Sequence, residues 1–420
     1  MSTSVLIAVL ARAFLGGEQT VEQVRERCAQ TLGRNWRWLS PLAKSYVAAF
    51  DGKTRPSLRQ VIRFLREDES FARLRRHRLT IARWLSEPQR MLPVAAAENW
   101  DLPPILSAGD LAAWLELTPG ELDWFADLKG LTTRSDTPEA LHHYRVRVLE
   151  KGAGGLRVIE APKARMKELQ RRILKGIVAA IPPHDAAHGF RTGRSIKTFV
   201  APHAGQRVVL RMDLHDFFPS ISFARVGALF RTAGYPDSVA ALLAGLSTTT
   251  SSFLNERRHL PQGAPTSPGI ANLCAYRCDC RLSGLARAAG AQYTRYADDL
   301  AFSGGEEFDR RVERFATHVA VVLHEEGFAV HHRKTRIMRR GIRQHLAGLV
   351  TNQKPNIIRS DYDLLKAILT NCVREGPASQ NREAHADFRA HLAGRIGFVA
   401  MINPSRAQRL RSIFEQINWL

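Results

Sequence analysis

The pattern of hydrophobic and polar positions changes character about a third of the way along this 420-residue chain. In residues 1–90, apolar side chains recur at helical spacing and alternate with arginine-rich faces, which predicts helices. From about residue 141, apolar and polar residues alternate around a glycine-rich turn, as is typical of a β-hairpin. Residues 206–218 predict a buried strand, and residues 291–304 predict a strand, a turn and a second strand. We therefore expect helices first, followed by mixed helices and strands.

The other segments predict further helices and one connection. Residues 91–108 are rich in proline and alanine, which predicts a linker. Pro182 and Pro183 end a helix that begins near residue 163, and Ser222 is placed to cap another. The remaining helices are expected at residues 109–130, 222–234, 305–327 and 359–420.

The composition adds a strong positive charge. The formal net charge is +21 and the isoelectric point is about 10.5. A protein this basic is expected to bind a polyanion, nucleic acid above all, although a generally basic proteome would give the same charge. One arginine-rich stretch could follow phosphates or only face solvent, and it contains Arg73, Arg75, Arg76, Arg78, Arg83 and Arg90.

Cysteine usage and hydropathy indicate a cytoplasmic protein without a membrane span. The five cysteines are scattered, which argues against a disulfide framework. Cys274, Cys278 and Cys280 cluster in an alanine-rich helical run without a fourth ligand nearby, so we favour core filling over a zinc site. We find no run of about 18 apolar residues that could cross a membrane.

Two groups of acidic residues carry the candidate chemistry. Asp213 lies within an apolar strand, with Asp216 three residues later, and Asp298 and Asp299 lie at the tip of the expected hairpin. A carboxylate in an apolar strand is costly unless it is paired or binds a metal, and adjacent aspartates repel unless a cation lies near them. Phosphoryl transfer to a sugar hydroxyl requires two divalent cations held by such carboxylates. Either group alone could be an ordinary turn or strand end, but together they predict a two-metal site.

Six segments, in the expected order, resemble the reverse transcriptase family between about residues 145 and 352. RMDLHDFFPSI (211–221) resembles the first catalytic-aspartate motif, and TRYADDLAFSG (294–304) resembles the Tyr-x-Asp-Asp hairpin. The other four segments resemble the finger motif, the template and nucleotide-binding motif, the lysine motif and the primer grip; they are LRVIEAPKARMKELQRRI (156–173), LPQGAPTSPGIANL (260–273), HHRKT (331–335) and LAGLVTN (346–352).

This resemblance implies an RNA-directed DNA polymerase. Asp213, Asp298 and Asp299 would be catalytic and would hold two Mg²⁺ ions, with Mn²⁺ as a substitute. Lys334 would protonate the leaving pyrophosphate or stabilise its charge. Phe218 would be a steric gate that rejects a ribose 2′ hydroxyl; the alternative is an ordinary core phenylalanine.

The resemblance also implies residues that bind nucleotide and RNA. Gln262 and Gly263 would shape the pocket of the incoming nucleotide. Arg157 would contact the triphosphate, with Lys151 as a further contact. RNA contacts are expected from three further residues, His203, Arg194 and Lys163.

Residues 187–203 resemble the segment before the catalytic strand in bacterial retron and group II intron enzymes. Two positions depart from the retron pattern: the Asn-Ala-x-x-His motif keeps only His203, and Asn352 replaces the glycine of Val-Thr-Gly. The short remainder of the chain accommodates a helical thumb without the maturase and endonuclease regions of many intron enzymes. The retron resemblance implies dNTP substrates, a noncoding RNA template copied into single-stranded DNA, and an effector protein in antiphage defence.

The expected fold is an α+β right-hand polymerase. Residues 1–108 would form a basic helical extension that binds RNA or a partner, residues 109–352 the fingers and a palm with an antiparallel sheet, and residues 353–420 a helical thumb. The alternatives are another bacterial reverse transcriptase class, of the abortive-infection or intron-derived kind, and a catalytically idle nucleic-acid-binding scaffold. An RNA-dependent RNA polymerase is disfavoured by Phe218.

Overall fold

The computed structural model describes residues 3–50, 56–68, 71, 79–83, 91–132, 137–150, 156–251 and 255–419. The chain divides into two compact units, Met1–Arg90 and Met91–Leu420, and we describe each by itself. Among the described residues, no helix is both long and apolar enough to cross a membrane.

The first unit is a small helical domain with its own core. Phe14 packs edge-on against Tyr46, with ring centroids 4.7 Å apart, and both side chains are buried. The Tyr46 hydroxyl donates a hydrogen bond to Gln19. Of the arginine-rich stretch predicted between Phe71 and Arg90, Arg83 is described, while Arg73, Arg75, Arg76, Arg78 and Arg90 lie outside the described residues. The helices of this unit are α1 (Thr3–Leu15), α2 (Val21–Leu32), α3 (Leu39–Phe50) and α4 (Leu58–Glu67).

Residues 91–107 pack on the second unit instead of forming the linker that their composition predicts. The Leu92 amide donates to the Gly234 carbonyl at 2.8 Å, and Trp100 and Leu102 pack against the main core. The predicted helical pair follows as α6 (Ala108–Leu115) and α7 (Pro119–Ala126), each begun by a capping box. The compact units thus divide after residue 90, and the expected domain boundary at residue 108 stays a prediction.

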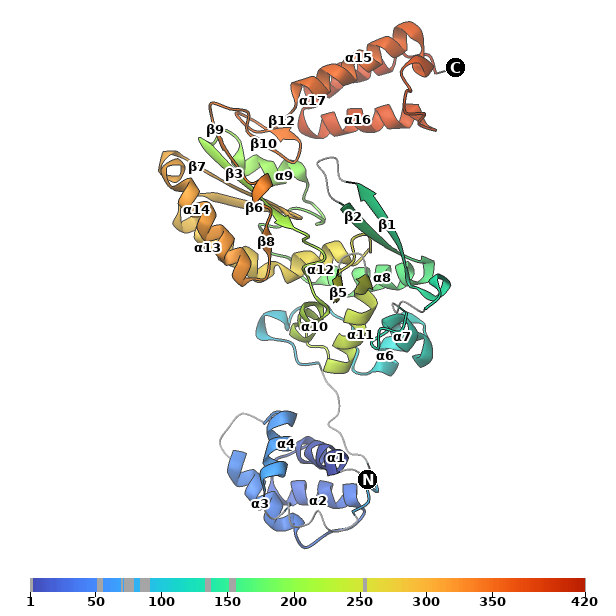
Figure 1. Cartoon of the computed structure of the whole chain (residues 1–420), viewed down its shortest axis with the longest axis vertical. Helices are drawn as coiled ribbons and strands as arrows, with labels where there is room; N and C mark the ends of the chain where they lie inside the picture. Colours follow the sequence, from blue (N-terminus) through green and yellow to red (C-terminus); the bar gives the residue numbers. More distant parts are fainter. Residues whose placement is uncertain are drawn as a thin grey trace. The chain divides into compact units, whose positions relative to one another are not determined.

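A five-stranded antiparallel sheet forms the centre of the second unit, with β3 (Val208–His215) inside it (Figure 1). One face of β3 is apolar: Val208, Leu210, Met212 and Leu214 belong to the same core as the buried side of α14 (Glu306–Glu325). Because side chains alternate along a strand, Asp213 belongs to the opposite face. The other strands of this sheet are β6 (Gln292–Tyr296), β7 (Asp299–Gly304), β8 (Ala329–Val330) and β9 (Arg336–Arg339).

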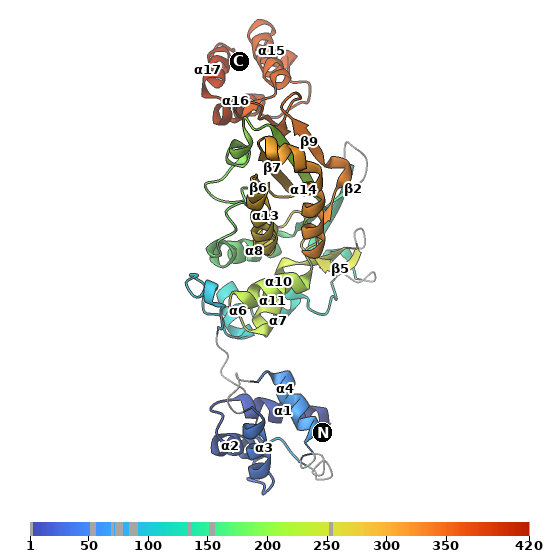
Figure 2. The same cartoon turned by 90° about the vertical axis from the view of Figure 1, so that its left-hand side faces the viewer.

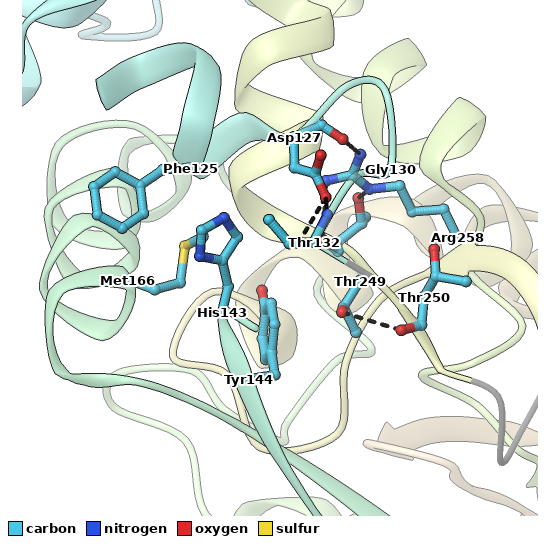
Figure 3. Close-up of a pocket in the computed structure, with 11 residues that line it drawn as sticks. Phe125, Asp127, Gly130, Thr132, His143, Tyr144, Met166, Thr249, Thr250 and Arg258 are labelled. Carbon is cyan, nitrogen blue, oxygen red and sulfur yellow. Dashed lines mark hydrogen bonds between the residues drawn. The ribbon is translucent and has the colours of Figure 1, made fainter. Parts of the chain in front are cut away.

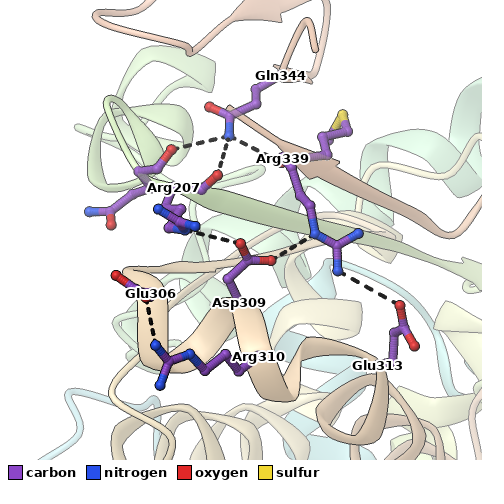
Figure 4. A network of polar contacts seen from close by, with 9 residues as sticks. Arg207, Glu306, Asp309, Arg310, Glu313, Arg339 and Gln344 are labelled. Atoms are coloured by element: carbon purple, nitrogen blue, oxygen red, sulfur yellow. Dashed lines mark hydrogen bonds and ion pairs between the residues drawn. The ribbon is translucent and has the colours of Figure 1, made fainter. Parts of the chain in front are cut away.

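A polar network joins the start of α14 to the edge of this sheet (Figure 4). Arg207 and Arg339 each donate through Nε to one carboxylate oxygen of Asp309, at 3.1 and 2.8 Å. Gln344 donates through its side-chain amide to the carbonyls of Gln206, Arg207 and Met338. These contacts fix the helix over the strands that carry the acidic residues.

The remaining elements of the second unit surround the sheet. Helices α6, α7, α10 and α11 lie at one end of this unit and α15–α17 at the other (Figures 1 and 2). The hairpin of β1 (Tyr144–Glu150) and β2 (Leu156–Pro162) pairs along its full length. The further helices are α8 (Ala164–Gly176), α9 (Ile196–Val200), α10 (Phe223–Thr232), α11 (Asp237–Ser247), α12 (Ser267–Cys274), α13 (Tyr276–Ala288), α15 (Arg359–Glu375), α16 (Phe388–Ile402) and α17 (Pro404–Phe414). The further strands are β4 (Thr249–Ser251), β5 (Asn255–His259), β10 (His345–Leu346), β11 (Leu349–Val350) and β12 (Asn356–Ile357).

Several local predictions can be compared directly. Ser222 caps α10 as predicted, its side chain accepting from the Arg225 amide. Helix α8 ends at Gly176, before the two prolines, because a 3₁₀ turn intervenes. Cys278 fills the core, whereas Cys280 is exposed, so core filling is wrong for Cys280. The α+β class is confirmed.

A small pocket beside the hairpin shows how the helices of this end are tied together (Figure 3). Arg258 on β5 donates to the carbonyls of Ala126, Asp127 and Gly245, at 2.7 to 2.8 Å. These carbonyls belong to the ends of α7 and α11, where helix carbonyls lack intrahelical partners. One half-buried guanidinium therefore joins two helices to β5.

Candidate active site

Asp213 and Asp299 face each other across two hydrogen-bonded strands. The register of β3 and β7 makes them direct Cα partners. Asp298 precedes β7, and its carbonyl accepts a hydrogen bond from the Leu214 amide at 2.9 Å. The structure thus brings together all three aspartates that the sequence predicts. Asp216, by contrast, has a φ of 45° and pairs with His215 at 3.1 Å.

The hairpin turn between β6 and β7 is strained and well supported. Ala297 has a φ of 56°, a left-handed conformation that costs a non-glycine residue about 1–2 kcal/mol. Its carbonyl accepts from Arg295 at 3.0 Å. Gly189 lies so close that a Cβ there would meet the Ala297 nitrogen at 2.7 Å. The surrounding structure therefore fixes the turn that carries Asp298 and Asp299.

A buried network behind this turn was not predicted from the sequence. Arg295 is 1% exposed and pairs with Asp279 on α13, at 2.7 Å and 2.8 Å through two nitrogens. It also donates to Asn272, which in turn donates to the Gly189 carbonyl. An arginine inside the hairpin strand that leads to the two aspartates was the available sequence signal, because a charge buried there needs a partner.

Two basic side chains form ion pairs with two of the three aspartates. Lys334 donates from Nζ to both oxygens of Asp213, at 2.9 and 3.0 Å. Arg211, two residues before Asp213 and on the same strand face, donates to one oxygen of Asp299 at 2.7 and 2.9 Å. The sequence predicts Lys334 in this place, but Arg211 was missed.

The surroundings of Asp298 and Asp299 raise the pKa of each carboxyl group above the ordinary aspartate value. Burial raises the pKa of Asp298, and the charges of Asp299 and Asp213 raise it further. Burial also raises the pKa of Asp299, although Arg211 opposes this. Carboxylates that repel one another in this way are the groups that a cation between them would stabilise.

The donor set fits divalent cations, although the carboxylates are paired with Lys334 and Arg211 in this structure. Across the described ranges, no group of three or more His, Cys, Asp or Glu side chains converges closely enough to hold a metal ion. Asp213 and Asp299 on one sheet face, with Asp298 in the adjoining turn, nevertheless offer hard oxygen ligands of the kind that Mg²⁺ prefers.

Aromatic side chains lie close to one another near Phe218 and Tyr296. Phe218 lies 5.6 Å from Phe217 and 6.2 Å from Phe190, measured between ring centroids. Phe190 is half exposed, has a φ of 57° and lies 6.3 Å from Tyr296. Phe218 is only partly buried and packs against the main core, so its role as a steric gate stays a prediction. Phe190 was not predicted as a member of this site.

The predicted nucleotide loop lies against the hairpin of β1 and β2. The Gln262 carbonyl accepts from the Glu160 amide on β2 at 2.9 Å. Gly263 has a φ of 132°, and a Cβ there would meet the Glu160 carbonyl oxygen at 3.1 Å, so glycine is required for both reasons. Arg157 is exposed on the same strand β2, and Lys151 lies outside the described residues.

The three residues expected to bind RNA have other partners in the structure. His203 is 0% exposed, and its two nitrogens contact the Ser303 and Thr294 hydroxyls at 2.7 and 2.8 Å. Direct RNA contact by His203 is therefore wrong, because its ring ties the preceding helical turn to β6 and β7. Lys163 donates to the carbonyls of Glu139 and Ala140, and Arg194 pairs loosely with Asp185 at 4.0 Å.

Comparison with known proteins agrees with this geometry. Residues 148–360 match the family model of reverse transcriptase (RNA-dependent DNA polymerase). The retron Mx65 reverse transcriptase of Myxococcus xanthus is 45% identical over 283 residues, which are 65% of this chain and 64% of that protein. The retron Mx162 reverse transcriptase of the same organism is 36% identical over 72% of this chain and 65% of its own length. The chain thus spans just under two thirds of each Myxococcus relative. The retron Ec86 reverse transcriptase of Escherichia coli is 30% identical, over 64% of this chain and 79% of its own length.

Proposed function

Because the chain belongs to the reverse transcriptase family, we propose that it polymerises DNA on an RNA template. The observation that carries this proposal is the pairing of Asp213 with Asp299 across β3 and β7, with Asp298 in the adjoining turn. The strained, buttressed turn holds these carboxylates rigidly, as catalysis by positioning requires.

In this proposal Asp213, Asp298 and Asp299 hold Mg²⁺, with Mn²⁺ as a substitute. Such cations activate a primer hydroxyl and neutralise the triphosphate. Lys334 is the nearest cation to Asp213 and is half exposed, so it can turn toward the leaving pyrophosphate as a proton or charge donor. Arg211 keeps Asp299 oriented from within the same strand face.

Three further residues would select and hold the nucleotide. Phe218, whose ring lies next to Phe190, would border the site and exclude a ribose 2′ hydroxyl. Gln262 would contact the nucleotide from the loop that lies on β2, and Arg157 on β2 would reach the triphosphate. We place the fingers and palm in residues 109–352 and the thumb in residues 353–420.

The relatives support a narrower proposal for template and product. Three of them are named retron reverse transcriptases, so we propose a structured noncoding RNA as template and single-stranded DNA as product. The thumb helices α16 and α17 carry arginines suited to RNA shape, among them Arg389, Arg395, Arg406 and Arg409. The basic extension of residues 1–108 would bind this RNA or an effector protein of an antiphage system.

The test is expression of the gene with its native flanking DNA, followed by extraction of total nucleic acid and RNase treatment. We expect a discrete small single-stranded DNA, absent from the Asp298→Ala variant. If this DNA is missing but the purified chain extends a DNA primer on RNA with Mg²⁺, the retron assignment fails and another reverse transcriptase class remains. If neither activity is found, the chain is an idle nucleic-acid-binding scaffold.

A further inference from the structure

Glu160 and His259 form a buried pair between the fingers hairpin and the strand that leads to the nucleotide loop. His259 Nε2 lies 3.0 Å from Glu160 Oε2, and each side chain is 1% exposed. His259 Nδ1 lies 3.0 Å from the Arg257 carbonyl oxygen, which can only accept. The second oxygen, Glu160 Oε1, is buried and has no hydrogen-bond partner among the residues that the structure describes.

This geometry determines how many protons the pair holds. Nδ1 must carry a hydrogen, because it faces a carbonyl oxygen. One more proton must lie between Nε2 and Oε2, whether the pair is an imidazolium with a carboxylate or a neutral imidazole with a carboxylic acid. Loss of that proton would leave a lone pair facing a buried carboxylate without water to separate them.

The pair is connected directly to the nucleotide loop. The backbone amide of Glu160 donates to the Gln262 carbonyl, and the carbonyl of Glu160 limits the space at Gly263. His259 precedes Gln262 by three residues. Glu160 therefore contacts the loop through its backbone and the strand before the loop through its side chain.

The backbone around His259 links this junction to the aromatic wall. His259 pairs with Thr249 in β4 and bridges to Ser222, while the Leu260 amide donates to the Ile221 carbonyl. Ile221 ends the segment that begins at Phe218. A shift of β5 would thus move both the loop and the backbone next to the predicted gate.

We propose that Glu160 and His259 are positioning residues that hold the nucleotide loop and the fingers strand in register through one shared proton. This inference rests on the proposed polymerase function and adds a proton-dependent control of nucleotide binding to it. Neither residue touches the substrate; they act through Gln262 and through Arg157 on β2.

Neighbouring groups leave the shared proton in place. Arg258, the residue directly before His259, directs its guanidinium to the carbonyls of α7 and α11. Tyr144 on β1 stays neutral because burial raises its pKa. Burial alone would lower the pKa of His259, but Glu160 outweighs it and the pKa is raised. The proton is therefore held to a higher pH than that of an ordinary histidine.

The test is steady-state incorporation by the full chain on a primed RNA template, with KM for dNTP and kcat measured between about pH 6 and pH 9. For the wild type we expect KM to rise at least about tenfold on the alkaline side, with a midpoint above the ordinary histidine pKa, while kcat changes less. A KM that stays constant over this range overturns the proposal without any variant.

Three variants separate positioning from stability. His259→Gln keeps an amide donor toward Glu160 but cannot titrate, so its KM should lose the alkaline rise. His259→Leu removes the donor and should raise KM at every pH. Glu160→Gln removes the carboxylate and should also raise KM about tenfold, with a smaller effect on kcat.

The matched control is His385→Gln in the thumb, where His385 contacts Glu383 at 3.2 Å but the Glu383 side chain is 83% exposed. It should leave the pH profile of KM unchanged. If the Glu160 and His259 variants lower the melting temperature but keep the wild-type KM profile, the pair is only structural and the proposal fails. Absence of incorporation by the wild type would instead contradict the proposed function itself.

Discussion

Lys334 Nζ donates hydrogen bonds to both carboxylate oxygens of Asp213, at 2.9 and 3.0 Å. A cation bound to that carboxylate must therefore compete with the ammonium group. We predict that Lys334→Ala lowers the Mg²⁺ concentration needed for half-maximal incorporation and lowers the maximal rate by roughly 10²-fold, the contribution typical of a general acid. Metal titrations of primer extension measure both quantities. Lys334→Arg, which keeps the charge, should change the metal requirement less; an unchanged requirement in Lys334→Ala would contradict the competition.

Phe218 should control the choice between deoxyribonucleotides and ribonucleotides. In the proposed function its ring, which lies beside Phe190, would border the site. A 2′ hydroxyl forced against the ring would overpack the site, which typically costs about 1–3 kcal/mol. We predict that Phe218→Ala reduces discrimination by roughly one to two orders of magnitude, measured as the ratio of kcat/KM for dNTP and rNTP. Phe398→Ala, an exposed phenylalanine on α16, is the control. Unchanged discrimination in Phe218→Ala would assign this ring to packing.

Arg295 should be essential for the stability of the larger unit. Removing one partner of a buried ion pair leaves an uncompensated charge, at a cost of about 3–5 kcal/mol. We predict a loss of this size in the free energy of unfolding for Arg295→Met, because Asp279 is fully buried. Denaturant unfolding of the full chain measures it. The control is Arg277→Met, which removes an exposed arginine that pairs with Glu326. Because Glu326 keeps its ion pair with Arg281, the free energy of unfolding should fall by less than about 1 kcal/mol. Similar losses in both variants would contradict the buried-pair argument.

His203 should make the protein sensitive to mild acid. Burial lowers its pKa to about 3, so the folded state keeps it neutral while the unfolded state protonates it near pH 6.5. The unfolded state then binds more protons, and stability falls by about 1.4 kcal/mol per pH unit as the pH drops below about 6.5. Denaturation midpoints measured over this range test the slope. His203→Gln, which cannot titrate, should show a shallower dependence; an identical slope would mean that other groups dominate.

The elements with strong periodicity could be predicted from the sequence, and so could the meeting of the aspartates. Strand β3 and the β6–β7 hairpin carry alternating or continuously apolar residues. The order of the motifs indicates which aspartates correspond to the catalytic aspartates of the family. Residues 91–107 misled the prediction because proline and alanine indicate a connection, while Trp100 and Leu102 find a core that only the folded chain provides.

The side-chain partners at the site could not be predicted in the same way. Arg211 and Asp299 are 88 residues apart in sequence, and their contact depends on strand register. His203 was assigned to RNA because of its motif, but its burial follows from two hydroxyls contributed by β6 and β7. The partners of a polar residue are set by tertiary contacts, which local pattern does not encode.

The alternation of β3 has a consequence for how this gene can change. Val208, Leu210, Met212 and Leu214 belong to the core shared with α14, whereas Arg211 and Asp213 occupy the other face. Deleting or inserting one codon before Asp213 would turn its carboxylate into that core and bring a hydrocarbon side chain to Lys334. Conservative replacements in this strand are tolerable one at a time, but changes in its length are not. We therefore expect changes in length to be tolerated only in the loops that join the strands.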